Sequence, residues 1–267
     1  MSRRTSWGIF LTFLGFFLIT GSREDIWGDA KASYKVAEQV VEFGTVELGY
    51  AWPLGADSGR NNRFYAPYGA LTSLVHVPGA YAIKKVRELG DRDLTRVWRP
   101  LIQHLPSALA GALTCLLFFR LACRLRVRPR VAGVTTAILA TATLVWPYAR
   151  DPYSEMLQAA CFTGFLGALV ATAEEPSRRR ALALGAWAGL LCNAKLIYVV
   201  SLAGGGLFLV VALRRGVLRL LPFALLGFAP FFALHAGYAY LRYRVRLSAN
   251  PWTSAVPSID TIVFPVQ

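Results

Sequence analysis

Four ionisable residues stand next to apolar stretches, where their chemistry would be available at a membrane surface. Asp29 opens the segment "GDAKASYKVAEQVVEFG" shortly after the apolar run 7–20, while Asp151 and Glu155 lie in "WPYARDPYSEMLQ". A positioned carboxylate can take a proton from an attacking nucleophile, and an ammonium such as that of Lys195 can hold a phosphate. These residue types suit the transfer of a group away from a phosphate.

Each of these residues also has a plain structural interpretation, and the sequence leaves both open. Asp29 could cap the helix that it opens, because Asp is among the favoured N-cap residues. Asp151 precedes Pro152 and Glu155 follows within one turn, as is common at the start of a helix. Lys195 could pair with either of these two carboxylates, since an ammonium inside a bilayer is costly unless an anion accompanies it.

The composition indicates a membrane protein. Of the 267 residues, 55% are hydrophobic, which is more than a soluble domain tolerates. The formal net charge is +14, but the basic residues form short groups between apolar runs, which favours orientation in a membrane over nucleic-acid binding. Neither the histidines nor the cysteines have metal-ligand spacing, so no metal-ligating residue is assigned. The cysteines lie inside apolar runs, where we expect them to pack: Cys115, Cys123, Cys161 and Cys192.

The arginine-dense loops predict how the chain is oriented. The apolar runs occupy 7–20, 64–83, 100–122, 131–149, 154–173, 181–213 and 217–240. Short loops rich in arginine lie at 124–130, 178–180 and 214–219. By the positive-inside rule these loops lie in the cytoplasm together with the N-terminal pair Arg3 and Arg4.

We expect the run 64–83 not to cross the membrane. If it crossed, every later arginine loop would move to the outside. Its sequence, "FYAPYGALTSLVHVPGAYAI", also contains two prolines and two glycines, which interrupt a helix. We therefore predict a helix on or dipping into the outer face, within a single external loop 23–99. The basic residues Lys84, Lys85 and Arg87 fit the alternative, in which this run does cross.

The run 181–213 is about twice as long as one crossing needs and has arginines at both ends. We predict that it leaves the cytoplasm and returns, turning at "CNAK" (192–195). The outgoing arm would then span roughly 20 Å, against a hydrocarbon core of roughly 30 Å. Lys195 is therefore expected below the outer surface, in protein or in a water-filled cavity. The run 217–240 is the last span and leads from the cytoplasm to the outside. The chain then has seven spans and an external C-terminus.

The segment after Asp29 has the two-sided pattern of an amphipathic helix on a membrane surface. The apolar side carries Tyr34, Ala37, Val40 and Val41, and the other side largely carries Lys31, Lys35, Glu38 and Glu42.

The expected fold class is all-α: a polytopic membrane bundle of about seven transmembrane helices, with external juxtamembrane helices in the first loop. Residues 1–22 form the first transmembrane anchor, which we favour over a cleavable signal peptide because no A-x-A-like site follows the apolar core. The external loop is 23–99, the six-span bundle is 100–240, and an external C-terminal segment is 241–267.

In this order the motifs resemble the integral-membrane glycosyltransferases of the C superfamily, specifically the bacterial proteins similar to protein O-mannosyltransferases and to the lipid A aminoarabinose transferase. An acidic residue opens a surface helix, a proline-containing external helix follows in "RFYAPYGALTSLVHVPGAYAI", and Arg99 begins the second span. A short outer loop, "DPYSE", and a small-residue span that ends in a lysine, "LGAWAGLLCNAK", complete the set.

The resemblance implies transfer of a sugar from a polyprenyl-phosphate donor to an external acceptor, which is a lipid, a glycan or a protein. It implies that Asp29 is the catalytic carboxylate and that Asp151 and Glu155 have a supporting acidic role. The residues expected to bind the substrate, with the lysine on the donor phosphate, are Lys195, Tyr34, Arg99 and Tyr65.

The expected partners are the lipid-linked donor and membrane lipids, with no nucleic acid. Family members are usually longer, so a C-terminal half or a partner subunit is also expected. No cofactor is assigned, and a divalent metal ion stays an open alternative. The expected location is the bacterial inner membrane, as a multi-pass protein with its active site on the external face.

A different functional class also fits the sequence. A non-enzymatic polytopic protein, such as a lipid-linked-sugar flippase or a scaffold subunit, would share these features, as would a degenerate fragment of the enzyme. This class predicts that Asp29 is replaceable by Asn or Ser, which also cap helices.

Overall fold

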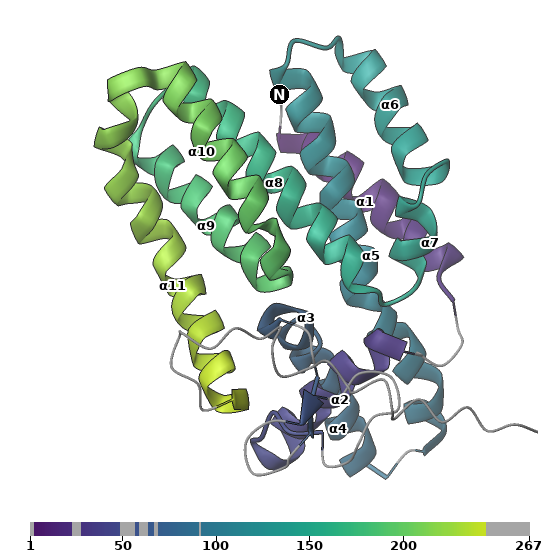
Figure 1. Ribbon diagram of the computed structural model, residues 1–267. Coiled ribbons are helices and arrows are strands. Elements are labelled where there is room, and N and C mark those ends of the chain that lie inside the picture. The colour runs from purple at the N-terminus through teal and green to yellow at the C-terminus, as the bar shows by residue number, and fades with distance from the viewer. Residues whose placement is uncertain are drawn as a thin grey trace, which may run out of the picture.

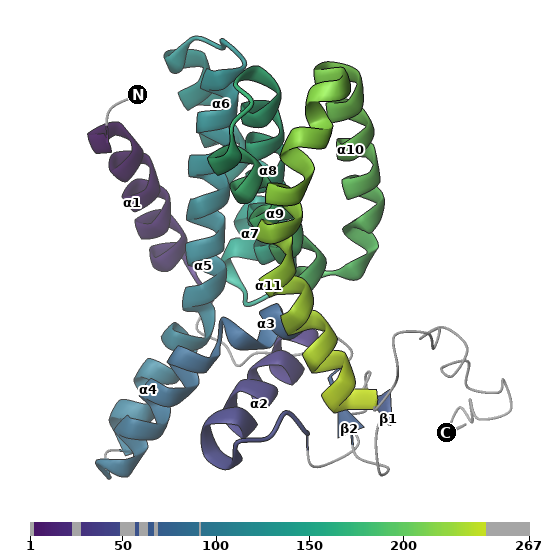
Figure 2. The same ribbon diagram turned by 90° about the vertical axis from the view of Figure 1, so that its left-hand side faces the viewer.

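The computed structural model describes residues 3–22, 28–48, 57–58, 64–66, 69–90 and 92–243. Apart from a short ribbon, in which β1 (Asp57–Ser58) pairs antiparallel with β2 (Phe64–Tyr65), the regular structure of these residues is helical. The expected all-α fold class is therefore confirmed. Figures 1 and 2 show a bundle of long helices with a layer of shorter helices across one end.

The bundle contains eight of the described helices. They are α1 (Arg3–Thr20), α5 (Arg92–Arg124), α6 (Pro129–Thr141), α7 (Val145–Arg150), α8 (Ser154–Glu174), α9 (Arg178–Ala194), α10 (Val199–Leu213) and α11 (Val217–Tyr243). Two short 3-10 turns, Leu196–Tyr198 and Arg214–Gly216, precede α10 and α11. The layer at the end of the bundle contains α2 (Gly28–Phe43), α3 (Ala70–Leu74) and α4 (Val77–Glu88).

Four helical stretches are long and apolar enough to cross a membrane, so the chain is a multi-pass membrane protein. They are Val97–Arg124, Ser154–Glu174, Leu196–Leu213 and Val217–Arg242. The helix at the N-terminus, Arg4–Thr20, is apolar but shorter. Its Phe17 is fully buried in a core that α1 shares with α5, α7 and α8.

The arginine-dense loops gather at the end of the bundle that lies opposite the surface layer (Figure 1). The Arg124 Nη1 atom lies 3.0 Å from Glu174 Oε2, which joins the ends of α5 and α8. The Arg120 guanidinium donates a hydrogen bond to Ser6 Oγ at 3.1 Å, which brings the start of α1 to the same end. This arrangement agrees with the predicted placement of these loops on one side of the membrane.

The run 64–83 is divided among β2, α3 and α4, and neither helix is among the candidate spans. Pro78 stands in the first turn of α4, where its missing N–H costs nothing. The described residues of this run thus form two short helices and one strand rather than one continuous helix, and the expectation that the run does not cross the membrane stays a prediction.

Helix α2 has the predicted position and the predicted two-sided pattern. It ends where Gly44 takes a positive φ of 66°, a conformation that favours glycine. Its apolar face, however, is covered by protein: Tyr34 and Ala37 pack with Ala80 of α4, and Val36 packs with Leu48. Helix α4 and the segment after α2 thus fold back over this face, and the expected position of α2 on a membrane surface stays a prediction.

Salt bridges and hydrogen bonds hold α2 to α4 and α5. The Arg99 guanidinium lies 3.0 Å from Glu38, and the Arg87 guanidinium lies 2.7 Å from Glu42. Lys84 Nζ donates to the Val41 carbonyl oxygen at 3.1 Å. These side chains are partly exposed, so each ion pair contributes about 0–1 kcal/mol, and burial of the apolar face supplies the larger part.

Helices α9 and α11 pack backbone against backbone. A Cβ placed on Gly185 would lie 1.9 Å from the Ala224 carbonyl oxygen, and one on Gly227 would lie 2.1 Å from the Leu182 carbonyl oxygen. Farther along α9, the buried Asn193 Nδ2 donates to the Phe231 carbonyl oxygen of α11 at 2.6 Å. Small residues and one interhelical hydrogen bond of this kind are what association inside a bilayer requires.

This packing predicts the effect of added methyl groups. Gly185→Ala and Gly227→Ala should each destabilise the detergent-solubilised protein by about 1–3 kcal/mol, because the new Cβ meets a carbonyl oxygen on the facing helix. Gly204→Ala in α10 is the matched control, because its Cβ would meet nothing within 4 Å. Thermal unfolding measures the difference, and equal melting temperatures for Gly185→Ala and Gly204→Ala would contradict the close packing.

Candidate functional site

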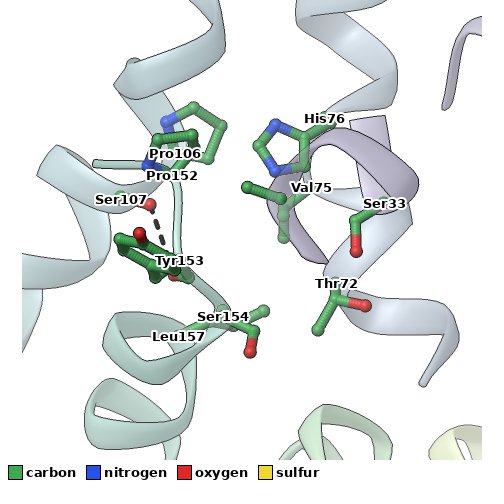
Figure 3. Close-up of a pocket in the computed structure, with 11 residues that line it drawn as sticks. Ser33, Thr72, Val75, His76, Pro106, Ser107, Pro152, Tyr153, Ser154 and Leu157 are labelled. Atoms are coloured by element: carbon green, nitrogen blue, oxygen red, sulfur yellow. Dashed lines mark hydrogen bonds between the residues drawn. The ribbon is translucent and has the colours of Figure 1, made fainter. Parts of the chain in front are cut away.

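A small polar pocket lies where the surface layer meets the bundle (Figure 3). Its volume is about 20 Å³, which is room for about one water molecule or one hydroxyl group. Its lining residues, hereafter the polar pocket, are Ala30, Ser33, Thr72, Val75, His76, Pro106, Ser107, Pro152, Tyr153, Ser154 and Leu157. They come from α2, the α3–α4 segment, α5, and the turn into α8.

Local structure holds these side chains in place. Thr72 Oγ1 donates to the Gly69 carbonyl oxygen at 2.6 Å, at the start of α3. Tyr153 has extended backbone as the N-cap of α8, and its carbonyl oxygen accepts from Ser107 Oγ at 3.5 Å. Ser154 Oγ accepts from Gln158 Nε2 at 3.0 Å. Three of the hydroxyl groups around the pocket are therefore already hydrogen-bonded.

His76 and Tyr34 form a buried polar pair beside the pocket. The two rings contact each other edge to face, with centroids 5.8 Å apart. His76 Nδ1 and the Tyr34 hydroxyl are both buried and have no hydrogen-bond partner among the described residues. The Tyr34 hydroxyl lies near Gln103 and Arg99 of α5, but without hydrogen-bond geometry to either.

Burial changes the protonation of both rings. It lowers the pKa of His76 to about 4, helped by the nearby His104, so the imidazole is neutral at neutral pH. Burial also raises the pKa of Tyr34 to about 12, with a further contribution from Glu38, so the phenol keeps its proton. The junction between the surface layer and the bundle thus presents uncharged polar groups.

A second, larger cavity lies on the other side of α3. Its volume is about 500 Å³. Its lining residues, hereafter the apolar cavity, are Val36, Ala37, Val40, Val46, Ala70, Ser73, Leu74, Val77, Ala233, Leu234, Gly237, Tyr238, Tyr240 and Leu241. Helices α2, α3 and α4 form one wall and the outer half of α11 forms the other. The hydroxyl groups of Ser73 and Tyr238 are buried there without partners among the described residues.

The predicted acidic residues lie around the polar pocket rather than in its lining. Asp29 belongs to the first turn of α2, next to Ala30, and its side chain lies outside the described residues. Asp151 is half-buried in the turn before α8, and Glu155 is exposed in the first turn of α8. The interpretation of Asp151 as an N-cap is wrong, because α8 begins at Ser154 and its N-cap is Tyr153.

Lys195 differs from its predicted environment. It is exposed, with extended backbone directly after α9, and no described carboxylate pairs with it. The alternative of a structural ion pair with Asp151 or Glu155 is therefore contradicted. Helix α9 has 17 residues, or about 25 Å, so it reaches farther than the predicted arm of roughly 20 Å. The neighbouring Asn193 contacts Gly69, which places the lysine close to the start of α3.

The other predicted substrate-binding residues are engaged by the protein. Arg99 pairs with Glu38, and Tyr34 of α2 is buried against Ala80 of α4. Tyr65 is 2% exposed in β2. The structure thus gives Arg99 and Tyr34 contacts within the surface layer, and their binding of substrate stays a prediction.

Sequence reasoning did not select the residues that line the polar pocket. The sequence pattern of the histidines speaks only against a metal site, and nothing in the pattern singles out Ser33, Thr72 or Ser107. One signal was present: His76 interrupts the apolar string "LVHVP", where an uncharged role is expected of a buried imidazole. The hydroxyl residues carried no comparable signal, because they converge from separate elements.

The low pKa of His76 predicts that acid destabilises the fold. Between about pH 6.5 and pH 4 the unfolded chain binds a proton that folded His76 does not, so the unfolding free energy falls as the pH falls. The contribution of this residue amounts to about 2 kcal/mol between pH 7 and pH 5. His76→Gln should flatten the dependence of melting temperature on pH in this window. Equal slopes for the variant and the wild type would contradict burial of a neutral imidazole.

The polar pocket and the apolar cavity share one wall. Along α2 the pocket contacts Ala30 and Ser33 and the cavity contacts Val36 and Ala37, one turn farther on. Along α3, its following turn and the start of α4, Thr72, Val75 and His76 line the pocket, whereas Ala70, Ser73, Leu74 and Val77 line the cavity. No protein-family model, curated protein or solved structure matches this chain, so these two spaces and the residues around them carry the functional argument.

Proposed function

We propose that this protein is a membrane glycosyltransferase that moves a sugar from a polyprenyl-phosphate donor to an acceptor on the external face. The observation that carries the proposal is the shared wall between the apolar cavity and the polar pocket. A lipid-linked sugar has one long apolar chain and one polar head, so it needs an apolar site beside a polar one. The polar pocket has room for one hydroxyl group of the sugar, and the sugar ring and phosphate would stay outside it, toward Lys195. Helices α2 and α3 separate two such spaces by the thickness of one helix.

The chemistry requires few groups. The acceptor hydroxyl or amine attacks the anomeric carbon of the sugar, the bond from that carbon to the phosphate oxygen breaks, and polyprenyl phosphate leaves. Asp29, at the start of α2 beside the polar pocket, takes the proton of the acceptor. Lys195, near the start of α3, offers an ammonium to the phosphate as its charge increases. Asp151 and Glu155, on either side of the turn that lines the pocket, have the supporting acidic role.

The topology in this proposal has seven crossings. In addition to the four long apolar helices, α1, α9, and α6 with α7 connect the two ends of the bundle (Figure 2). The arginine-dense loops then face the cytoplasm, and the layer α2–α4 lies on the external side of the bacterial inner membrane. Both spaces open at the level where a lipid-linked donor presents its head group.

The central test replaces the proposed catalytic carboxylate. Asp29→Asn should keep helix α2, because loss of one negative charge from the first turn of a helix costs only about 0.3–1 kcal/mol, but the Asn amide does not accept a proton at neutral pH. Transfer should fall by about a hundredfold to ten-thousandfold. Sugar transfer from a purified polyprenyl-phosphate donor measures this in the full-length protein together with any partner subunit. Glu88→Gln is the control, because Glu88 is an exposed acid of the same layer that pairs with Lys85.

The outcomes separate the functional classes. Activity of Asp29→Asn within a fewfold of the wild type would assign the carboxylate role to Asp151 or Glu155. Absence of transfer by the wild type, with the donor still bound, would favour a flippase or a scaffold subunit.

The apolar cavity allows an independent test of the donor. Gly237 lines this cavity, and a Cβ on it would meet nothing within 4 Å, so Gly237→Leu should fill the space without a clash. We expect this variant to weaken polyprenyl-phosphate binding by about tenfold or more, because the lipid chain loses its place. Gly206→Leu in α10 is the matched control, since its surroundings are equally open but outside the cavity. Equal donor affinity in the two variants would exclude the cavity as the site of the lipid chain.

A further inference from the structure

The polar pocket has a buried imidazole without a partner. His76 is 5% exposed, and its ring projects from the turn between α3 and α4 toward Pro106 and Pro152 (Figure 3). Its Nδ1 atom has no hydrogen-bond partner among the described residues. Because an unpaired buried polar atom is costly, the pocket is suited to a ligand that supplies the missing hydrogen bond.

The charge of the surroundings restricts what that ligand can be. None of the described side chains that line the pocket is charged at neutral pH. Of the groups near His76, Tyr34 of α2 keeps its proton, and burial together with the nearby His104 of α5 lowers the pKa of His76 and holds its imidazole neutral. An ion would lose its hydration here without gaining a counter-charge, which disfavours phosphate, carboxylate and ammonium groups.

The size and shape of the pocket restrict the ligand further. The available volume of about 20 Å³ admits one oxygen atom and not a sugar ring. Pro106, Pro152 and Leu157 form apolar sides, as expected around the carbon that carries a hydroxyl group. A neutral imidazole has one donor and one acceptor nitrogen, and a hydroxyl group complements either of them. Ser33 supplies a second hydroxyl group on the α2 side (Figure 3).

We propose that the polar pocket is a subsite for a single uncharged hydroxyl group of a carbohydrate, hydrogen-bonded to His76 Nδ1. The proposal deepens the glycosyltransferase function and rests on it for its biological meaning. In this subsite His76 positions the sugar and does not take part in proton transfer. The subsite discriminates between a sugar with a free hydroxyl group at the bound position and one with a charged substituent there.

The test uses binding, so that it does not depend on transfer. The chain has 3 histidines, and the NMR signals of labelled imidazoles in the detergent-solubilised full chain can be assigned with single variants. The probes are glucose, mannose and galactose, with glucosamine and glucuronate as charged counterparts. We expect at least one neutral sugar to shift the His76 signal saturably, and the charged counterparts to bind more weakly by about tenfold.

Variants provide the controls. His76→Phe keeps a flat ring but has no nitrogen, and should weaken binding of the neutral sugar by about threefold to tenfold. His76→Gln retains a donor and an acceptor and should stay close to the wild type. His235→Phe is the matched control, because His235 also has an unpaired buried Nδ1 but lies outside the pocket. The shift of the His104 signal in these variants and the melting temperature report whether the fold is intact.

The outcomes distinguish this proposal from the glycosyltransferase function. A His76 signal that no sugar shifts, with Asp29-dependent transfer still present, overturns the subsite and assigns the pocket to a water molecule. A saturable shift in a protein that transfers no sugar supports the subsite and overturns the enzymatic role. Equal shifts by neutral and charged sugars overturn the selectivity on which the proposal rests.

Discussion

Helices α9 and α11 approach so closely that Gly185 of α9 lies against a carbonyl oxygen of α11, and Gly227 of α11 lies against a carbonyl oxygen of α9. The positions of α11 and of the surface layer depend on this contact. Inside a bilayer no hydrophobic effect drives two apolar helices together, so the contact relies on van der Waals packing and on the hydrogen bond of Asn193. Asn193 also touches Gly69, at the beginning of α3, through its carbonyl oxygen. The end of α9 therefore sets the distance between α11 and the surface layer, which is the width of the apolar cavity.

The surface layer is built by a different set of forces. None of its helices α2, α3 and α4 is among the four candidate spans, and α2 buries its apolar face against α4 and the segment after α2, as the hydrophobic effect favours in water. Ion pairs such as Arg99 with Glu38 add direction to this packing but little energy, because they are partly exposed. The result is a protein surface at the membrane boundary that holds the start of α2 over the bundle.

Buried polar groups without partners concentrate where these two parts meet. His76, Tyr34 and Gln103 each have at least one such atom, and they come from the turn after α3, from α2 and from α5. Elsewhere in the bundle the hydroxyl groups of threonine bond to carbonyl oxygens one turn earlier, so they are satisfied within their own helices. Further unpaired buried atoms among the described residues lie along α11 and at the end of α9, and the group at this junction is the one that lies beside the polar pocket.

The sequence by itself determined the parts that depend on local pattern. Apolar length predicted the long membrane helices and the helical spacing after Asp29 predicted α2, while the direction that the arginine groups predict for the helices stays a prediction. Only the tertiary structure decided what covers each surface: protein rather than lipid over Tyr34, solvent rather than a carboxylate beside Lys195. The polar pocket belongs to the same class, because Ser33, His76 and the turn before α8 are far apart in the chain. Periodicity reports the face on which a residue lies, whereas a contact between distant segments depends on how closely helices pack, which here rests on single glycines.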